Sequence, residues 1–570
     1  MIRSGEDIMH GWIIGENIEL NIEEGWKSER RNQYMFAENL LNKFPEDIIN
    51  SIGEESDFFL DGYVVNKKEL LKETDSNKWS DAFEKIYKSP QFVSKLRGAF
   101  GGFILEHKTR ELIVYTDHMG NHAVYYYNQN GKRIIGSNLY ILVQTLKKNR
   151  IQYHLDNNAA KYMLTYGYML DDSTFIKEIK RVLPGYKVIL KNEKIVKEAY
   201  YCLNNKNIEE CSIQEAIDKV DKAFRIAVQR EFEKDREYGY RHLVDLSGGL
   251  DSRMVSWVAD EMGYRDQLNI TYCKNGYLDQ KISQRIAEDL KHDFLFKPLD
   301  DMNWLYDIDE NVKKNNGAAL FDGITGGNRF LKLLDKNQFG IEHTGMIGDV
   351  VLSAFFAEED VAYAKPKFGK LKYSDRLTIQ LNKNILENYP NQEIFTLVTR
   401  GILGAASSYI IRQNYFETAS PFMDVDFMDT CLRLPLSYRA RHKIYLEWIW
   451  QKYPEAAEYG WEKWGGVKPK KTEIPRRKVI TAWRLLKWRA EGILGKSPKD
   501  INMNPVDYWY GQNPTLQSFF ETYFYENIEN PVIENEIKKA IEELFHQGNV
   551  WEKGMALTVL GLVKLYFDVI

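Results

Sequence analysis

The sequence of 570 residues predicts an α/β protein with three regions along the chain. From about residue 9 to 200, short apolar strands are separated by Asp, Asn and Gly turns, as in hairpins. From about 215 to 350, strands alternate with helical stretches, which is typical of a parallel sheet covered by helices. Beyond about 370 the pattern is mostly helical. The strands predicted in the first region are 58–60, 100–105, 111–115, 123–127 and 186–190.

A polar stretch at 204–207 marks the predicted domain boundary. It divides the chain into an N-terminal domain, 1–205, and a C-terminal domain, 212–570. A basic, proline-containing stretch at 468–478 interrupts the helical region, and we interpret it as a loop or lid. Its basic side chains allow three interpretations: a solvated surface loop, a lid that closes over phosphates, or a contact with a leader peptide.

The composition excludes several classes of protein. A formal net charge of -5 argues against a general nucleic-acid surface. The four cysteines are scattered and lack zinc-like spacing, which suits a reducing compartment. The N-terminus has no long apolar segment, and no run of about 18 apolar residues occurs. We therefore expect a cytoplasmic protein that binds neither nucleic acid nor a membrane.

The hexapeptide Ser-Gly-Gly-Leu-Asp-Ser at 247–252 is the most informative segment. It follows an apolar strand, 242–246, and opens into a helix, 253–259. The glycine pair lets the backbone approach a ligand closely, and the N–H groups at the start of the helix favour phosphate oxygens. Ser247 and Ser252 add hydroxyl donors, and Asp251 can hold Mg²⁺ against the same phosphates. No Lys follows the glycines, so this is not a Walker P-loop.

Together with this loop, ordered motifs along nearly the whole chain resemble those of the asparagine synthetase family. Residues 60–66 are similar to its (D/N)GxxxN segment, 96–126 to its LxGxF…RDxxG…LYY stretch, and 183–185 to its Pro-Gly turn. Residues 344–349 stand where the family has GxGxDE, 417–424 resemble ExRxPFLD, and 463–469 resemble KxGFxxP. The resemblance implies an αββα glutaminase-like sandwich of the Ntn type, followed by an α/β PP-loop ATP-pyrophosphatase domain.

The resemblance also implies a reaction. A substrate carboxylate attacks the α-phosphorus of ATP, which gives an acyl-adenylate and pyrophosphate, and an amine then displaces AMP. Asp251 and Asp349 are the implied Mg²⁺ ligands, Lys463 is the implied cation for both steps, and Glu417 is the implied base for the amine. The residues implied in ATP and pyrophosphate binding are Leu246, Ser247, Gly248, Gly249, Asp251, Ser252, Thr271 and Gly345.

Some of these residues also have simpler interpretations. Asp349 alone would suit a helix N-cap, a position that Asp favours. Asp279 either caps the next helix or matches an acidic position of the family near the loop. Lys463 alone would suit a solvated surface.

The first departure from the family lies at the N-terminus. Members that hydrolyse glutamine begin Met-Cys-Gly, so that removal of Met leaves a cysteine whose thiol attacks and whose α-amine acts as base. Here Met9-His10-Gly11 occupies that segment, and eight residues precede Met9. His10 supplies neither the thiol nor a free α-amine, so we expect no glutaminase activity.

The second departure lies beside Asp349. The family has Glu two places after the Thr344 position, or Tyr in β-lactam synthetases, whereas this chain has Met346, which cannot take a proton. Val350 replaces the Glu that usually follows the motif's Asp. One member of the Tyr–Glu pair that acts as the base in β-lactam synthetases is therefore missing.

Family members without an active glutaminase domain include β-lactam synthetases and the macrolactam synthetases that close the rings of lasso peptides. We favour the macrolactam type, with a precursor peptide and its processing protease as partners. The carboxylate is then an Asp or Glu side chain and the amine a peptide N-terminus. The alternative is an asparagine synthetase, or an amidase of sugar acids, that uses free ammonia. A catalytically silent binding or scaffold protein is a third class, against which the intact Ser247, Asp251, Asp349 and Lys463 argue.

Overall fold

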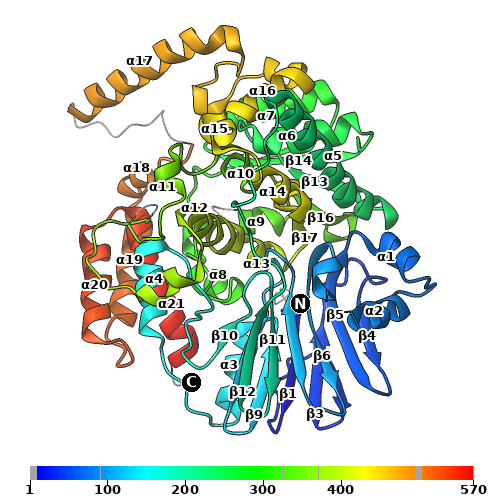
Figure 1. The fold of residues 1–570 in the computed structure, drawn as a ribbon. Coiled ribbons are helices and arrows are strands. Elements are labelled where there is room, and N and C mark those ends of the chain that lie inside the picture. The colour runs from blue at the N-terminus through cyan, green and yellow to red at the C-terminus, as the bar shows by residue number, and fades with distance from the viewer. Residues whose placement is uncertain (1–8, 90, 324–326, 370–371, 494–502, 569–570) are drawn as a thin grey trace.

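Two six-stranded antiparallel sheets form the N-terminal part of the protein (Figure 1). The computed structural model describes residues 9–89, 91–323, 327–369, 372–493 and 503–568. One sheet has the order β10 (Lys180–Arg181), β8 (Tyr125–Gln129), β9 (Lys132–Gly136), β1 (Gly11–Glu16), β3 (Tyr34–Asn39) and β2 (Lys27–Arg31). The other has the order β12 (Lys194–Ala199), β11 (Tyr186–Lys191), β7 (Leu112–Thr116), β6 (Gly98–Glu106), β5 (Ser56–Val64) and β4 (Ile49–Ile52).

The sheets pack face to face between two layers of helices. Along β1, Trp12 and Ile14 face the second sheet, whereas Ile13 faces α3 (Leu139–Lys148) and α4 (Asn157–Tyr166). Along β5, Phe59 faces the first sheet and Leu60 faces α1 (Lys67–Glu73) and α2 (Trp79–Tyr87). Because both faces of the inner strands such as β1 and β5 are covered, these strands are apolar at consecutive positions. This is the αββα layering that the resemblance implied.

A five-stranded parallel sheet follows, as the alternation of strands and helices predicted. Its order is β15 (Asp293–Pro298), β14 (Gln267–Cys273), β13 (Arg241–Asp245), β16 (Phe339–His343) and β17 (Glu417–Ala419). Its helices include α5 (Ile213–Glu237), which begins at a capping box formed by Ser212 and Glu215, α6 (Asp251–Glu261) and α7 (Leu278–Leu290). The chain moves from β13 to β14 on one side and later to β16 on the other. The carboxyl end of β13 is therefore a topological switch point, where open α/β sheets bind ligands.

The C-terminal part is helical, and it packs against both preceding parts. Next to the parallel sheet and its helix α5 lie α10 (Gly348–Ser353), α14 (Val425–Leu432) and α16 (Lys443–Lys452). The next helix, α17 (Ile474–Ile493), extends away from the body (Figure 1). The last helices are α18 (Val506–Gly511), α19 (Pro514–Asn527), α20 (Asn535–Gln547) and α21 (Val550–Phe567). Leu544 of α20 and Leu557 of α21 share one buried apolar cluster with Leu142 of α3 and Met163 of α4. The two halves of the chain therefore share a core.

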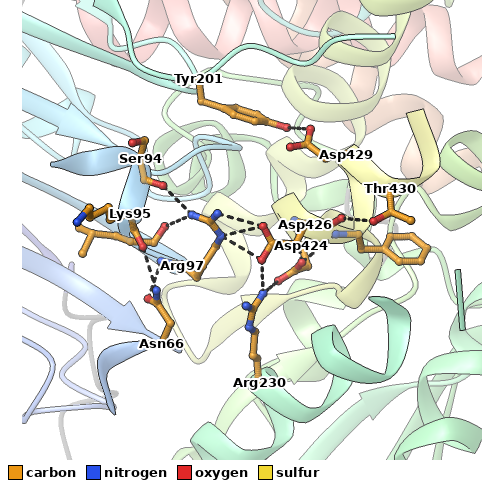
Figure 2. Close-up of polar contacts among 12 residues, drawn as sticks. Asn66, Ser94, Lys95, Arg97, Tyr201, Arg230, Asp424, Asp426, Asp429 and Thr430 are labelled. Carbon is orange, nitrogen blue, oxygen red and sulfur yellow. Dashed lines mark hydrogen bonds and ion pairs between the residues drawn. The ribbon is translucent and has the colours of Figure 1, made fainter. Parts of the chain in front are cut away.

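Charged side chains also join the two halves (Figure 2). Arg97 binds Asp426 of α14 at 3.0 Å, and Arg230 of α5 binds Asp424 at 3.1 Å and Asp426 at 2.6 Å. Asp424 in turn caps α14, accepting from the backbone N–H groups of two residues in its first turn. One carboxylate, Asp426, thus ties the N-terminal sandwich to a helix beside the parallel sheet.

Two sequence-based expectations need correction. The strand expected at 123–127 begins only at Tyr125. The basic stretch 468–478 is only partly a loop, because α17 begins within it at Ile474. Pro475 does not prevent this, because a proline in the first turn removes no hydrogen bond of the helix. Lys468 pairs with the surface carboxylate of Glu458.

One helical stretch, Gln392–Arg412, is long and apolar enough to cross a membrane, with a mean hydropathy of 1.5. Of its apolar window, 72% is buried inside the fold, which is the burial of a core helix. It passes through a π-helical segment, Leu397–Gly404, and ends in α13 (Ser408–Arg412).

Candidate functional site

The expected phosphate loop lies at the carboxyl end of β13. Its two serines bind each other, with the hydroxyl oxygens 3.0 Å apart and the Ser247 N–H donating to the Ser252 hydroxyl at 2.9 Å. The Gly249 N–H donates to the Ser247 hydroxyl at 3.1 Å. The loop is thus closed on itself at the start of α6, where the helix dipole favours an anion.

The turn after β16 brings the second carboxylate to this loop. The backbone N–H of Asp349 donates to the Asp251 carboxylate at 2.9 Å. A Cβ on Gly345 would lie 2.4 Å from the Ser252 nitrogen, and one on Gly348 would lie 2.7 Å from the Asp251 carboxyl carbon. Only glycine permits this approach at both positions. Asp349 lies in the first turn of α10 and is not its N-cap residue, which is Ile347.

The surroundings of Asp251 disfavour its charged form. Burial, and then the neighbouring charge of Asp349, raise the pKa of Asp251 to about 7. The Tyr445 hydroxyl donates to the other carboxylate oxygen at 2.7 Å. Two carboxylates at one phosphate loop, one with a raised pKa, form an oxygen-rich site suited to Mg²⁺.

Lys463 completes this cluster. Its Nζ lies 3.8 Å from the Asp349 carboxylate and 3.2 Å from Nε2 of His442. Burial, and then the charge of Lys463, lower the pKa of His442 to about 4, so the imidazole is neutral and accepts from the ammonium. His442 and Arg441 both have left-handed backbone conformations, with φ of 63° and 57°. Such conformations are costly for these residue types and occur preferentially at functional sites.

The segment that carries Lys463 is fastened to the phosphate loop. The Glu462 N–H donates to the Gly248 carbonyl at 3.1 Å, and the Gly248 N–H donates to Asp279 at 2.9 Å. Arg253 is fully buried and donates to the carbonyls of Gly248 at 3.3 Å and Ala456 at 3.0 Å. Asp279 therefore binds the backbone of the loop and is not the N-cap of α7, which is Tyr277. Burial raises the pKa of Asp279 to about 6.

Leu246 and Thr271, two of the residues implied in ATP binding, are hydrogen-bonded within the protein. The Thr271 hydroxyl donates to the Leu246 carbonyl, and its oxygen lies 2.9 Å from the Ser283 hydroxyl. The side chains of Leu246 and Thr271 are 1% and 4% exposed. They support the loop from the end of β13 and from β14, and their side chains are not open to a ligand.

Glu417 lies away from this cluster, at the start of β17. Its carboxylate accepts from Nε2 of His122 at 2.9 Å, across the interface between the two halves. Although burial lowers the pKa of His122, the Glu417 carboxylate raises it to about 9, so the imidazole is charged. Glu417, His122, Asp61 and His10 line one cavity of about 70 Å³. The structure thus groups Glu417 with His10 and not with Lys463.

His10 directly precedes β1. Its Nδ1 is buried without a hydrogen-bond partner among the described residues. Burial lowers its pKa, so the ring is neutral. A larger groove of about 900 Å³ lies over the outer strands of the N-terminal part, beside Tyr87 and His107, and none of the expected site residues lines it.

One other group of described side chains could hold a metal ion: Asp235, His242 and His343, all buried. Asp235 lies 2.8 Å from Nε2 of His343 and 3.3 Å from Nδ1 of His242, and it also accepts from the Ile341 N–H at 2.9 Å. The remaining nitrogen of His343 lies 3.4 Å from Glu231. These bonds satisfy one another, so the group is a buried network between α5 and the sheet.

Sequence-based reasoning missed Tyr445, His442 and Arg253. Tyr445 and His442 come from a segment about 190 residues beyond the loop, with no local pattern to mark them. Arg253 directly follows the hexapeptide. A cation at the start of a helix, where the dipole disfavours it, was the signal that could have revealed its bracing role.

Comparisons with known proteins identify one domain. Residues 63–201 match the family described as a glutamine amidotransferase domain. A search of curated proteins found no match. The solved structure of glutamine phosphoribosylpyrophosphate amidotransferase from B. subtilis, complexed with ADP and GMP, is 11% identical over 51% of this chain and 76% of that chain, with a TM-score of 0.23. A structure of the allosteric regulatory enzyme of purine biosynthesis is 12% identical over 51% and 75%, also with a TM-score of 0.23.

These TM-scores are too low to support an argument about fold or function. The match over 63–201 covers four whole strands of the second sheet (β6, β7, β11 and β12) and three of the first (β8, β9 and β10), together with α1 to α4. The chain therefore contains a glutamine amidotransferase-type domain.

Proposed function

We propose that the protein is an ATP-dependent ligase that adenylates a carboxylate, releases pyrophosphate and forms an amide bond. The observation that carries the proposal is the convergence of Asp251, Asp349 and Lys463 on the loop at the switch point of the sheet. Phosphoryl and acyl transfer depend mainly on positioning and on charges aimed at the developing negative charge. Here the two carboxylates and the helix N-terminus would position the phosphates, and the Lys463 cation would face the developing negative charge.

The residues of the site fit Mg²⁺ and the phosphates of ATP. Asp251 and Asp349 would hold the ion, which neutralises phosphate charge when bound. The N–H groups of the 247–252 loop would receive the pyrophosphate oxygens. Lys463, held by the neutral His442, would place its ammonium against the oxygens that gain charge in both steps.

Glutamine does not supply the amine in this proposal, because the cavity around His10 has no thiol among its lining residues. We retain the macrolactam type as the favoured reaction, with free ammonia as the alternative amine. Glu417 is not retained as the base, because its carboxylate faces His122 across the domain interface. The amine would then lose its proton to water or to the adenylate phosphate.

Product analysis tests the proposal. The protein is incubated with Mg²⁺-ATP and either linear peptides that carry an internal Asp or Glu, or aspartate with ammonium chloride. AMP and pyrophosphate should form, with loss of one water from the peptide in the first case or appearance of asparagine in the second. Formation of ADP and phosphate would refute the reaction type. Product only with ammonium would select the alternative.

A further inference from the structure

Helix α17 extends beyond the body of the molecule (Figure 1), and it contacts the short segment Glu462–Trp464 that carries Lys463. Its 20 residues correspond to roughly 30 Å of helix. Its first turns are anchored to the body. Ile474 and Ile480 pack against the core that contains Trp464, and the Arg477 guanidinium lies 4.5 Å from the centre of the Trp464 ring.

The opposite face of α17 exposes a row of apolar side chains. Val479, Trp483 and Leu486 are 69%, 61% and 64% exposed. Their spacing of four and three residues places them on one face of the helix. Single exposed apolar residues are common on protein surfaces, whereas a row of three that includes tryptophan on a projecting helix marks an interaction surface.

The charge of the helix limits what can cover this row. The segment 474–493 contains six basic residues and one acidic residue, in a chain whose net charge is -5. Arg476 and Lys478 are both exposed beside the row, and Arg476 pairs with Glu473 at 3.5 Å. A second copy of α17 would bring like charges together, so self-association is disfavoured. The complementary surface is anionic.

We propose that α17 lies in the plane of an anionic lipid surface. Val479, Trp483 and Leu486 insert at the boundary between headgroups and acyl chains, and the basic residues contact lipid phosphates. A lipid surface is favoured over an acidic protein because tryptophan prefers this boundary and long cationic side chains extend from it to the headgroups. This proposal departs from the expectation that the protein binds no membrane, which rested on the lack of a long apolar run; a helix that lies in the interface does not need one. The inference is independent of the proposed ligase reaction.

Co-sedimentation of the full chain with lipid vesicles tests this inference. Vesicles of phosphatidylcholine and phosphatidylglycerol in equal parts should bind the protein at about 0.1 M salt and release it at about 1 M salt. Pure phosphatidylcholine vesicles should bind it weakly. Trp483→Glu or Leu486→Glu should lower the partition constant at least about tenfold. Removing two cations with Arg476→Gln and Lys478→Gln should lower it roughly thirtyfold.

Leu333→Glu is the matched control, because Leu333 is a solitary apolar side chain that is 72% exposed elsewhere on the surface. It should bind vesicles as the wild type does. Failure of the wild type to bind anionic vesicles would overturn the inference, as would equal binding to neutral vesicles or an equal loss in the Leu333 variant. Binding of polyglutamate without vesicle binding would make the partner an acidic protein. A dimer abolished by Trp483→Glu, without vesicle binding, would indicate self-association.

Discussion

Asp251→Asn should make the nucleotide-free protein more stable while abolishing its ATP-dependent reaction. Burial and Asp349 raise the pKa of Asp251 from 3.8 to about 7. The native state therefore binds a proton that the unfolded state releases between about pH 4 and 7, and stability falls as the pH rises through this range. Between these two pKa values, each pH unit lowers the free energy of unfolding by about 1.4 kcal/mol. Above pH 7 the ionised Asp251 therefore lowers it by up to about 4 kcal/mol. Asparagine resembles the protonated form and does not incur this cost.

The hydrogen bonds of the site reduce the gain. The substituted amide could still accept from the Asp349 N–H, and its NH₂ group could donate to the Tyr445 oxygen, which leaves the phenol hydrogen without its present acceptor. This loss costs about 1 kcal/mol. We therefore expect Asp251→Asn to gain about 2–3 kcal/mol in free energy of unfolding at pH 8, and to lose up to about 1 kcal/mol at pH 4.

Urea unfolding of the nucleotide-free protein, at several pH values from 4 to 8, measures this difference. Asp349→Asn is the matched control: its own side chain is 47% exposed, and it removes only the smaller of the two causes of the raised Asp251 pKa, so its gain should be smaller. Mg²⁺-ATP should stabilise the wild type more than Asp251→Asn, because the ion supplies the charge that the carboxylate lacks. A gain that does not vary with pH would refute the assignment of the raised pKa to Asp251.

Other substitutions test the cation and the cavity between the two halves. Lys463→Ala should lower product formation by roughly 10²–10³ yet change the free energy of unfolding by less than about 1 kcal/mol, because its side chain is 53% exposed. Lys471→Ala, on the same segment and also ion-paired, should keep full activity. Incubation with glutamine should release no glutamate above the buffer rate, and release that survives His10→Ala would place a nucleophile elsewhere. Glu417→Gln should lower the free energy of unfolding at pH 7 by roughly 2–5 kcal/mol, because buried His122 loses the carboxylate that stabilises its charged form; unchanged stability with blocked amide formation would restore Glu417 as the base.

Much of the fold follows from the sequence because its signals are local. The strands of the sandwich are apolar at successive positions, since β1 and β5 are covered on both faces. The parallel sheet follows from the alternation of strands with helices. What could not be predicted is the core shared by α3, α4, α20 and α21, because nothing in a helix's own sequence says which distant helix covers it.

The candidate site divides in the same way. Asp251, Asp349 and Lys463 lie in motifs of short spacing, and the structure brings them together. Glu417 also lies in such a motif, but a motif does not say which end of a strand reaches the site. β17 pairs with β16 so that Glu417 lies opposite Ile341, whereas the carboxyl edge of the sheet is two residues further on at Ala419. The side chain therefore points to His122 and the cavity.

This geometry explains how an amidotransferase-type domain without its nucleophile remains part of the site. Arg97 holds Asp426 at the start of α14, immediately after the turn that follows β17. In that turn the Ser420 hydroxyl donates at 3.0 Å to the carbonyl of Met346, between Gly345 and Asp349. The N-terminal domain thus braces, through two short segments, the turn that sets Asp349 against Asp251. In the proposed reaction, its contribution is mechanical support of Asp251 and Asp349, which requires its packing and its Arg97 but not a glutaminase thiol.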